Sequence, residues 1–409
     1  MSEVYDILVV GGGPGGLAAG IYGSRARLKT SIVEKGRPGG QAASTMEMEN
    51  YPGTFRESTG PGIMKNFTEH AEHFGTEIFK GTVSDVDFTG PIKKVTTKDG
   101  ETYEAKSVIL SPGAEPRSLN IKGEGKLRGK GVSYCATCDA DFFEDLDVIV
   151  IGNGDAAIEE AMYLTRFAES VTVIVIHDEG TLDCNKASSE KAFKNAKLKW
   201  IWNSTLEEIV GDELVEKVVL KNIKTGELTE METNGVFFFV GTVPKTDFLK
   251  GKIELNEQGY IITNDLMETN VPGVYGVGDA RVKYLRQVVT AAADGAIAAV
   301  AAEKYLDEME SFRENVLDKK EPVLLAFWAP QVEACFDVLA NLEKKVEEKG
   351  GKLSLAKLDT YRNKKTSGSY NVTKVPTVIL FKDGEPVDRL EGAEAITPDA
   401  VEAMVKKVL

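Results

Sequence analysis

Near its N-terminus the chain reads YDILVVGGGPGGLAAG over residues 5–20, where an apolar run leads directly into a cluster of glycines. The apolar run predicts a buried strand over 5–10, and the residues after the glycines predict a helix over 17–27. A second strand is predicted over 29–33 and is followed by Glu34. Strand, glycine turn, helix and strand in this order predict a βαβ unit with a dinucleotide site.

The glycine turn has the G-x-G-x-x-G spacing. Glycine lets the backbone approach a pyrophosphate at the N-terminus of the helix, and the acid after the second strand can accept hydrogen bonds from a ribose. A turn that serves only the fold is the alternative. The predicted nucleotide contacts are Gly11, Gly13, Pro14, Gly15, Gly16 and Glu34.

The same pattern returns in the middle of the chain. A strand is predicted over 148–151, a turn over 152–157, a helix to about 167 and a strand over 171–176. Gly152, Gly154 and Ala157 have the spacing of a nicotinamide dinucleotide turn. The chain therefore contains two predicted dinucleotide-binding modules.

A third pattern begins after about residue 309, where a charged segment leads into a strand over 323–327 and a new α/β pattern. We predict an α/β chain with two Rossmann-like domains, each of the three-layer ββα type, and a smaller C-terminal domain. The predicted division is 1–116 with 247–308, 117–246, a linker over 309–320, and 321–409. A length of 409 residues agrees with several domains of about 150 residues each.

Composition narrows the possible settings and partners. Hydrophobic residues make up 42% of the chain, and no apolar run reaches the roughly 20 residues that cross a bilayer. No basic segment or cleavage signal precedes the first strand, so a soluble cytoplasmic protein is predicted. The 49 basic and 64 acidic residues give a net charge of −15, which disfavours nucleic acid and anionic membranes as partners.

The cysteines point to redox chemistry. Cys135 and Cys138 have the C-x-x-C spacing that lets two thiols close a small disulfide ring. Half of a zinc site is the alternative, but Cys184 and Cys335 are isolated and no histidine has zinc-finger spacing to the pair. A redox pair is therefore predicted, with no metal site.

A second glycine-rich stretch, GVYGVGDA over 273–280, is followed closely by Arg286 and Gln287, and here the sequence resembles the thioredoxin reductase family. The loops PGGQ over 38–41 and ENYPG over 49–53 match that family as well. The resemblance extends from residue 1 to about 308 and implies that the discontinuous first domain binds FAD. The implied FAD contacts beyond the first turn are Gly40, Gln41, Asn50, Val83, Ala114, Asp279, Arg286 and Gln287.

The resemblance also implies roles for the redox residues. Cys138 would face the flavin, Cys135 would attack the disulfide of thioredoxin or another protein, and Asp139 would manage protons. The sequence supports the last role independently, because larger flavin disulfide reductases use a C-terminal histidine and no histidine follows His177 here. A homodimer is implied, with the cysteine-bearing domain rotating between flavin and substrate.

The second glycine turn departs from the NADPH-dependent members. These carry a His-Arg-Arg segment and a further arginine for the 2′-phosphate, whereas residues 177–179 here read HDE and Asp183 follows. Each like-charge contact near 4 Å costs about 1 to 4 kcal/mol, so NADPH is disfavoured. We predict NADH, bound by Gly152, Gly154, Asp155, Ala157 and Glu179.

The alternative donor is a ferredoxin, which reduces the flavin in some relatives that have lost nicotinamide binding. The turn glycines would then remain only to pack the helix on the strand. Two other functions stay open: a redox-sensing flavoprotein whose C-terminal domain docks a partner, and a ferredoxin–NAD(P) reductase, which the Cys135 and Cys138 pair disfavours.

The last 89 or so residues resemble thioredoxin through the segments FWA (327–329), VPT (375–377), FKDG (381–384) and Gly392. Pro376 is the predicted cis proline. Where thioredoxin has C-G-P-C the chain has Val332-Glu333-Ala334-Cys335, and Ala326 replaces the buried aspartate. We therefore predict a domain that does not relay electrons, with Cys335 buried for packing. A monothiol role is the alternative.

Overall fold

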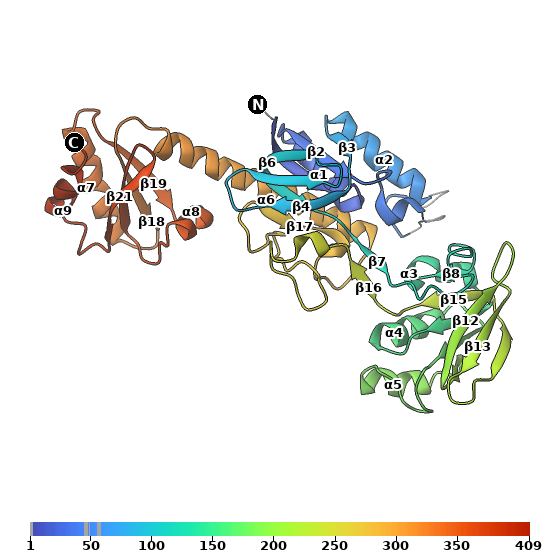
Figure 1. Cartoon of the computed structure of the whole chain (residues 1–409). Helices are drawn as coiled ribbons and strands as arrows, with labels where there is room; N and C mark the ends of the chain where they lie inside the picture. Colours follow the sequence, from blue (N-terminus) through green and yellow to red (C-terminus); the bar gives the residue numbers. More distant parts are fainter. Residues whose placement is uncertain (1–2, 45–47, 49, 55–58) are drawn as a thin grey trace. The chain divides into compact units, whose positions relative to one another are not determined.

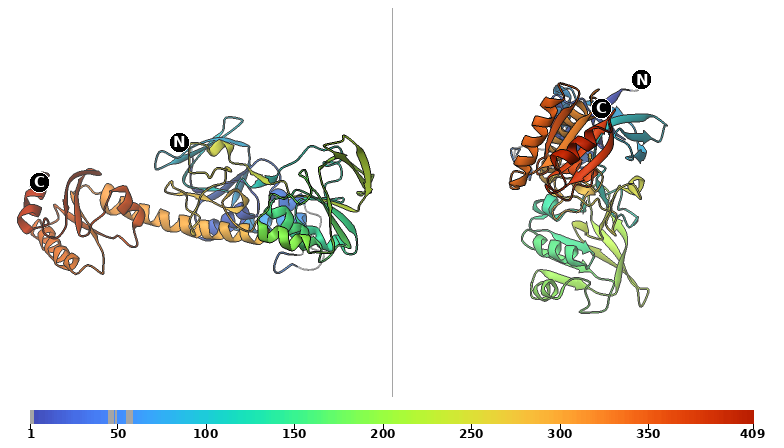
Figure 2. Two further views of the ribbon diagram at one scale, coloured as in Figure 1. Left: turned by 90° about the horizontal axis from the view of Figure 1, so that it is seen from below. Right: turned by 90° about the vertical axis from the view of Figure 1, so that its left-hand side faces the viewer.

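The computed structural model describes residues 3–44, 48, 50–54 and 59–409. The chain forms two compact units, Met1–Ala299 and Val300–Leu409 (Figure 1). Both consist of sheets flanked by helices, as the further views in Figure 2 show, which is the predicted α/β class. Among the described residues, no helix is both long enough and apolar enough to cross a membrane.

The first sheet of the N-terminal unit has seven strands, β1 (Val4–Val10), β2 (Thr30–Glu34), β3 (Glu77–Lys80), β4 (Val83–Asp87), β5 (Lys93–Thr97), β6 (Thr102–Leu110) and β17 (Val274–Gly276). Their order is β3-β2-β1-β6-β5-β4, and β17 also pairs with β6. β1, β2, β3, β6 and β17 run parallel. Their carboxyl ends therefore meet at one edge, which is where α/β sheets bind ligands.

Helices α1 (Pro14–Arg25) and α6 (Val288–Phe312) come together beside this sheet. α1 begins at Pro14, whose fixed φ suits the first helical position. The two helices approach so closely that a Cβ on Gly295 would lie 2.0 Å from the carbonyl oxygen of Gly15. Only glycine fits at this contact. Helix α2 (Gly60–His73) begins where the Thr59 side chain accepts a hydrogen bond from the Gly62 amide.

The second sheet consists of β8 (Val132–Ser133), β9 (Asp147–Ile151), β10 (Ser170–Ile174), β11 (Leu198–Ile201) and β15 (Gly235–Phe238). All its pairings are parallel, in the order β11-β10-β9-β15-β8. Helix α4 (Asp155–Leu164) packs on one face, and α5 (Lys186–Phe193) packs against α4. The antiparallel strands β12 (Ser204–Val210), β13 (Lys217–Asn222) and β14 (Leu228–Glu232) form the third layer on the other face.

The chain enters and leaves this second part through a pair of short antiparallel strands, β7 (Ala114–Pro116) and β16 (Thr242–Pro244). Both sides of the β9 strand are apolar and buried: Val148 and Val150 face α4, while Ile149 and Ile151 face the antiparallel layer. This arrangement explains why β9 reads as a continuous apolar run in the sequence.

The second unit contains a four-stranded sheet in the order β19-β18-β20-β21. Its elements are β18 (Val323–Trp328), α7 (Ala334–Glu348), β19 (Ser354–Asp359), α8 (Lys364–Ser369), β20 (Thr377–Lys382), β21 (Glu385–Glu391) and α9 (Pro398–Val405). The Val375–Pro376 peptide bond is cis, as predicted.

The segment predicted as a linker over 309–320 is helical through most of its length. α6 continues to Phe312, and a π-helical turn, η5 (Arg313–Leu317), follows. Phe312 and Val316 lie four residues apart on one helical face and are buried against Phe327 and Phe381. The charges of the segment thus occupy its outer face, and the segment contributes to the core of the second unit. The predicted domain limits stay predictions.

We predict that Gly295→Ala lowers the free energy of unfolding by about 3 kcal/mol, because the new methyl group overlaps backbone that has no room to yield. Urea denaturation measures the change. Gly125→Ala is the matched control, since a Cβ there meets nothing within 4 Å. Equal stability of the two variants would contradict the contact between α1 and α6.

Candidate functional site

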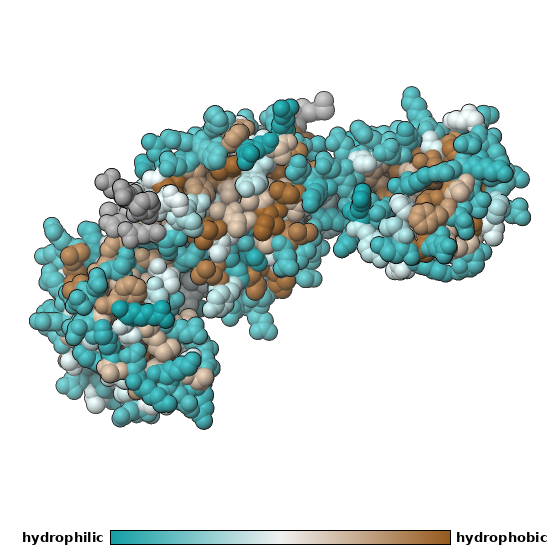
Figure 3. Space-filling view, turned by 180° about the vertical axis from the view of Figure 1, so that it is seen from behind, coloured by the Kyte–Doolittle hydropathy of each residue, from teal (hydrophilic) through white to brown (hydrophobic). Residues whose placement is uncertain are grey.

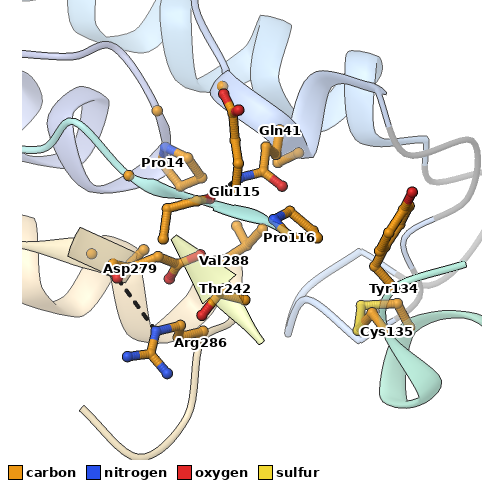
Figure 4. A pocket seen from close by; sticks show the side chains of 18 of the residues that line it. Pro14, Gln41, Glu115, Pro116, Tyr134, Cys135, Thr242, Asp279, Arg286 and Val288 are labelled. Carbon is orange, nitrogen blue, oxygen red and sulfur yellow. Dashed lines mark hydrogen bonds between the residues drawn. A yellow bond between two sulfur atoms is a disulfide. The ribbon is translucent and has the colours of Figure 1, made fainter. Parts of the chain in front are cut away.

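The N-terminal unit contains a cleft of about 1920 Å³ at the carboxyl edge of the first sheet. Every FAD contact predicted from the sequence lines it except Gly16, and Cys135, Cys138 and Asp139 line it too. Figure 4 shows Pro14, Gln41 and Asp279 around this cleft, with Cys135 on the right. Glu49, from the predicted ENYPG loop, lies outside the described residues.

The first glycine turn leaves open space at the start of α1. Gly11 has a φ of +97°, and a Cβ there would lie 2.2 Å from the Ser111 carbonyl oxygen. Gly16 lies beneath the turn, where a Cβ would meet the Gly11 carbonyl oxygen at 1.9 Å. Gly13, in contrast, has no atom within 4 Å of its Cβ position. The turn is therefore closed on its protein side and open on the side where a pyrophosphate would bind.

Glu34 is held at the end of β2 by two backbone amides. Its Oε2 accepts a hydrogen bond from Gly12 N at 2.6 Å, and its Oε1 accepts one from Gly36 N at 2.9 Å. A carboxylate has about four acceptor positions, so this side chain can still accept hydrogen bonds from ribose hydroxyl groups.

Asp279 lies after β17 in the short 3-10 helix η4 (Gly278–Ala280). Its Oδ1 is buried and has no hydrogen-bond partner among the described residues. Burial raises the pKa of Asp279, although Lys283 and Arg286 oppose the shift. An unpaired buried acceptor costs about 1–3 kcal/mol, and a ligand hydroxyl group would remove that cost. The turn, Glu34 and Asp279 thus fit FAD.

The two predicted redox cysteines form a disulfide, with their Cα atoms 5.3 Å apart. Cys135 precedes the single helical turn α3 (Ala136–Asp139), and η2 (Ala140–Phe143) follows it. A disulfide between them agrees with the redox interpretation and leaves neither sulfur as a zinc ligand in this state.

Two amide side chains hold the disulfide loop against the flavin side of the cleft. Gln287 Nε2 lies 3.8 Å from Cys135 Sγ and donates to Thr137 Oγ1 at 3.3 Å. Gln287 Oε1 lies 4.0 Å from Cys138 Sγ and accepts from Asn50 Nδ2 at 3.1 Å. The structure therefore brings together both cysteines and two of the residues predicted to lie near the flavin.

Asp139 is half-buried at the end of α3. Burial raises the pKa of its carboxyl group, and the charge of Asp141 acts in the same direction. Ser133 Oγ opposes the shift by donating a hydrogen bond to Asp139 Oδ2 at 2.6 Å. A carboxyl group with a raised pKa beside a disulfide is suited to deliver a proton to sulfur.

The second glycine turn has both closed and open parts. A Cβ on Gly152 would lie 2.6 Å from the Phe239 carbonyl oxygen, whereas Gly154 has nothing within 4 Å. Asp155 accepts hydrogen bonds from the backbone amide and the side chain of Asn185, both at 2.7 Å, and the backbone bond lowers its pKa. Asp183 N also donates to Asn153 O at 3.1 Å. The segment over 183–185 is thus tied to the turn.

The acids after β10 have partners that the sequence did not indicate. Asp178 forms an ion pair with Lys224, which lowers the pKa of Asp178. Asp183 Oδ2 lies 3.0 Å from His177 Nε2. Lys224 follows β13 and is far from these acids in sequence, so only the fold reveals it. Glu179 is exposed.

Asp294 is a buried acid on α6 that was not predicted from the sequence. It accepts hydrogen bonds from Gly278 N at 3.0 Å, Arg281 Nε at 3.0 Å and Lys283 Nζ at 2.7 Å. This side chain fixes the backbone that carries Asp279. One signal was present: a lone aspartate in the otherwise small and apolar run TAAADGAIAA over 290–299.

In the second unit, Cys335 is fully buried and free, as predicted, and Ala326 is buried in β18. Cys184 is also free and packs partly buried against the core beside α4.

The comparisons with known proteins agree with this geometry. Residues 5–295 match the family model described as pyridine nucleotide-disulphide oxidoreductase, and residues 304–407 match the thioredoxin model. The chain is 54% identical over 313 residues to a thioredoxin reductase of Peptoclostridium acidaminophilum, covering 75% of this chain and 98% of the relative. The chain belongs to the thioredoxin reductase family. It is therefore a flavin oxidoreductase, and the family predicted from its residues is confirmed.

A relative from Mycobacterium leprae, named bifunctional thioredoxin reductase/thioredoxin, is 36% identical and covers 96% of this chain and 94% of itself. Among solved structures, the thioredoxin reductase of Streptococcus pyogenes has a TM-score of 0.72 at 42% identity, covering 75% of this chain and 99% of that one. The enzyme from Giardia duodenalis has a TM-score of 0.70 at 36% identity, covering 75% of this chain and 100% of that one.

We predict that Asp279→Ala purifies with at least about tenfold less FAD than the parent, because a hydrogen bond to a charged group contributes about 1.5–3 kcal/mol. Absorbance of the supernatant after denaturation measures the flavin per chain. Asp265→Ala is the control, since Asp265 is an exposed acid in a neighbouring turn. Full FAD content in the Asp279 variant would contradict the assignment.

Proposed function

We propose that this flavoprotein reduces the disulfide of a separate thioredoxin, passing electrons through FAD to the Cys135–Cys138 disulfide. The observation that carries the proposal is the position of that disulfide in the FAD cleft, beside Gln287 and Asn50. Gly11, Gly13, Glu34 and Asp279 would hold the FAD, which would supply an electron pair to the disulfide after the donor has reduced it.

Opening the Cys135–Cys138 disulfide takes up two electrons and two protons and gives two thiols. The Cys135 thiolate would then attack the disulfide of thioredoxin, and one sulfur of thioredoxin would leave. Attack by Cys138 on the mixed disulfide would close the ring again and release thioredoxin with two thiols. Asp139 would protonate a leaving thiolate, which its raised pKa and its place at the end of α3 favour.

Cys135 must become accessible for this exchange, because both cysteines are partly buried and Gln287 contacts them. We propose that the second sheet and its layers rotate as one body about β7 and β16. These two strands are the places where the chain passes between the two sheets of the N-terminal unit. Two short strands offer less resistance to rotation than a packed interface.

A separate thioredoxin is the proposed substrate, although the relative from Mycobacterium leprae joins both functions in its name. The attacking cysteine of thioredoxin is replaced here by Val332, and the remaining Cys335 is inaccessible. A buried thiol cannot start disulfide exchange.

We also propose a cytoplasmic homodimer. The exposed side of α6 carries Val289, Ala293, Ile297 and Val300, spaced so that they share one helical face. Figure 3 shows apolar side chains gathered on one face of the N-terminal unit. An apolar stripe of this kind is typical of a surface that another subunit covers.

NADH is the proposed donor. Gly154 leaves room for a pyrophosphate, and Glu179 stands exposed after β10, where it can bind a ribose hydroxyl group but repels a 2′-phosphate. A second candidate is a ferredoxin donor. The backbone amides of Asp183 and Asn185 donate hydrogen bonds to residues of the second glycine turn. These bonds favour the ferredoxin donor, because a segment bonded to the turn hinders nicotinamide binding there.

We predict that the parent enzyme reduces many equivalents of thioredoxin per flavin. The turnover of Cys135→Ser and of Cys138→Ser should fall to background, because each variant lacks one of the two thiols that the exchange requires. Cys135→Ser should also show a long-wavelength absorption band from the Cys138 thiolate beside the oxidised flavin. Steady-state assays and spectra measure both. Cys335→Ala is the control and should retain turnover. Stoichiometric reduction alone would support the redox-sensor function instead.

We predict that NADH reduces the flavin at least about tenfold faster than NADPH at equal low concentration, since one like-charge contact costs about 1–4 kcal/mol. Glu179→Gln should bring the two rates closer together, and Lys224→Gln should separate them further by removing the cation that forms an ion pair with Asp178. Glu190→Gln, on the exposed side of α5, is the control. Anaerobic rapid mixing measures the rates. Reduction by ferredoxin but by neither nucleotide would refute NADH and support the second candidate.

A further inference from the structure

Ser133 is a buried polar residue beside the disulfide that the proposed exchange does not yet use. It is the last residue of β8 and is 5% exposed. It lies two residues before Cys135 and six before Asp139, so its side chain sits where the strand turns into α3. Its neighbour Val132 pairs with Val236 of β15, which anchors the strand in the second sheet.

The hydroxyl group of Ser133 has one proton to donate and two positions that accept. It accepts a hydrogen bond from Cys135 N at 3.1 Å. Asp139 Oδ2 lies 2.6 Å from the Ser133 hydroxyl group, and Cys135 O lies 3.4 Å from it. Because the first distance is shorter, we assign the hydrogen bond that Ser133 donates to Asp139 Oδ2. One hydroxyl group thus joins the backbone of Cys135 to the carboxyl group of Asp139.

We propose that Ser133 is a positioning residue that orients the Asp139 carboxyl group toward the disulfide and fixes its position relative to the backbone of Cys135. The inference rests on the proposed function, in which Asp139 protonates a leaving thiolate. The hydrogen bonds of the Ser133 hydroxyl group go to Asp139 and to the backbone of Cys135. Ser133 acts through Asp139.

The hydrogen bond that Ser133 donates determines the direction in which Ser133 shifts the pKa of Asp139. A hydrogen bond donated to a carboxylate favours the charged form, so Ser133 opposes the rise that burial causes in the pKa of Asp139. Asp141 on η2 raises the same pKa by its charge, and Glu160 on α4, which packs against α3, lines the same cleft. Without the Ser133 hydroxyl group, Asp139 should keep its proton to higher pH.

The test compares Ser133→Ala with Ser133→Thr, which retains a hydroxyl group. The control is Ser170→Ala, because Ser170 is 6% exposed in the same sheet and donates to Asp147 far from the disulfide. Turnover with thioredoxin is measured across pH for each variant. Infrared spectra of the oxidised protein follow the protonated carboxyl band that Asp139→Asn removes. Ser133→Val, which matches threonine in shape but lacks the hydroxyl group, replaces Ser133→Ala if the alanine variant does not fold.

The expected result is an alkaline limb of turnover shifted upward by about one pH unit in Ser133→Ala, with the infrared band persisting to higher pH by a similar amount. Ser133→Thr should restore both, and Ser170→Ala should change neither. An unshifted infrared band in Ser133→Ala, or a failure of Ser133→Thr to restore the band and the turnover, would overturn the inference. Full turnover in Asp139→Asn, together with a shifted band in Ser133→Ala, would instead refute the proposed role of Asp139 and leave its orientation by Ser133 standing.

Discussion

The close approach of backbone to backbone around the first glycine turn is the constraint on which the rest of the N-terminal unit depends. Gly16 rests on the carbonyl of Gly11, and Gly295 rests on the carbonyl of Gly15. Neither contact admits a methyl group. Because α1 is pressed into this corner, its N-terminal amides point into the cleft at the carboxyl edge of the sheet. The cleft is therefore a consequence of how tightly the helices meet.

Burial then determines what the acids of this cleft can do. Asp294 receives hydrogen bonds from an amide, an arginine and a lysine, so it serves as a fixed anion inside the protein. Asp279 has a buried oxygen without a hydrogen-bond partner among the described residues, so that oxygen can accept a hydrogen bond from a ligand. Asp139 has a raised pKa, and its side-chain donor among the residues that the structure describes is Ser133. Residues of one type thus take different roles because their donors differ.

The sequence predicted the features that depend on a few neighbouring residues. The glycine turns, the C-x-x-C pair, the missing attacking cysteine at Val332 and the cis Pro376 are all local patterns. Lys224 and Ser133 were not predicted because the folded structure determines their partners. Lys224, for example, bonds to Asp178, which lies 46 residues away in the sequence. The helix over residues 309–317 was not predicted for another reason. The segment is rich in charged residues, and the apolar face formed by Phe312 and Val316 is hard to recognise among them.

The second unit shows that a thioredoxin-like fold does not depend on thioredoxin chemistry. Its cores are formed by aliphatic and aromatic side chains on β18, β20, α7, α9 and the end of α6. Replacing a buried aspartate by Ala326 removes a charge from a low-dielectric interior, which relieves a cost to stability. Replacing a partly exposed cysteine by Val332 leaves those cores untouched. The packing of this unit is therefore independent of the two residues that thioredoxin uses for disulfide exchange and proton handling.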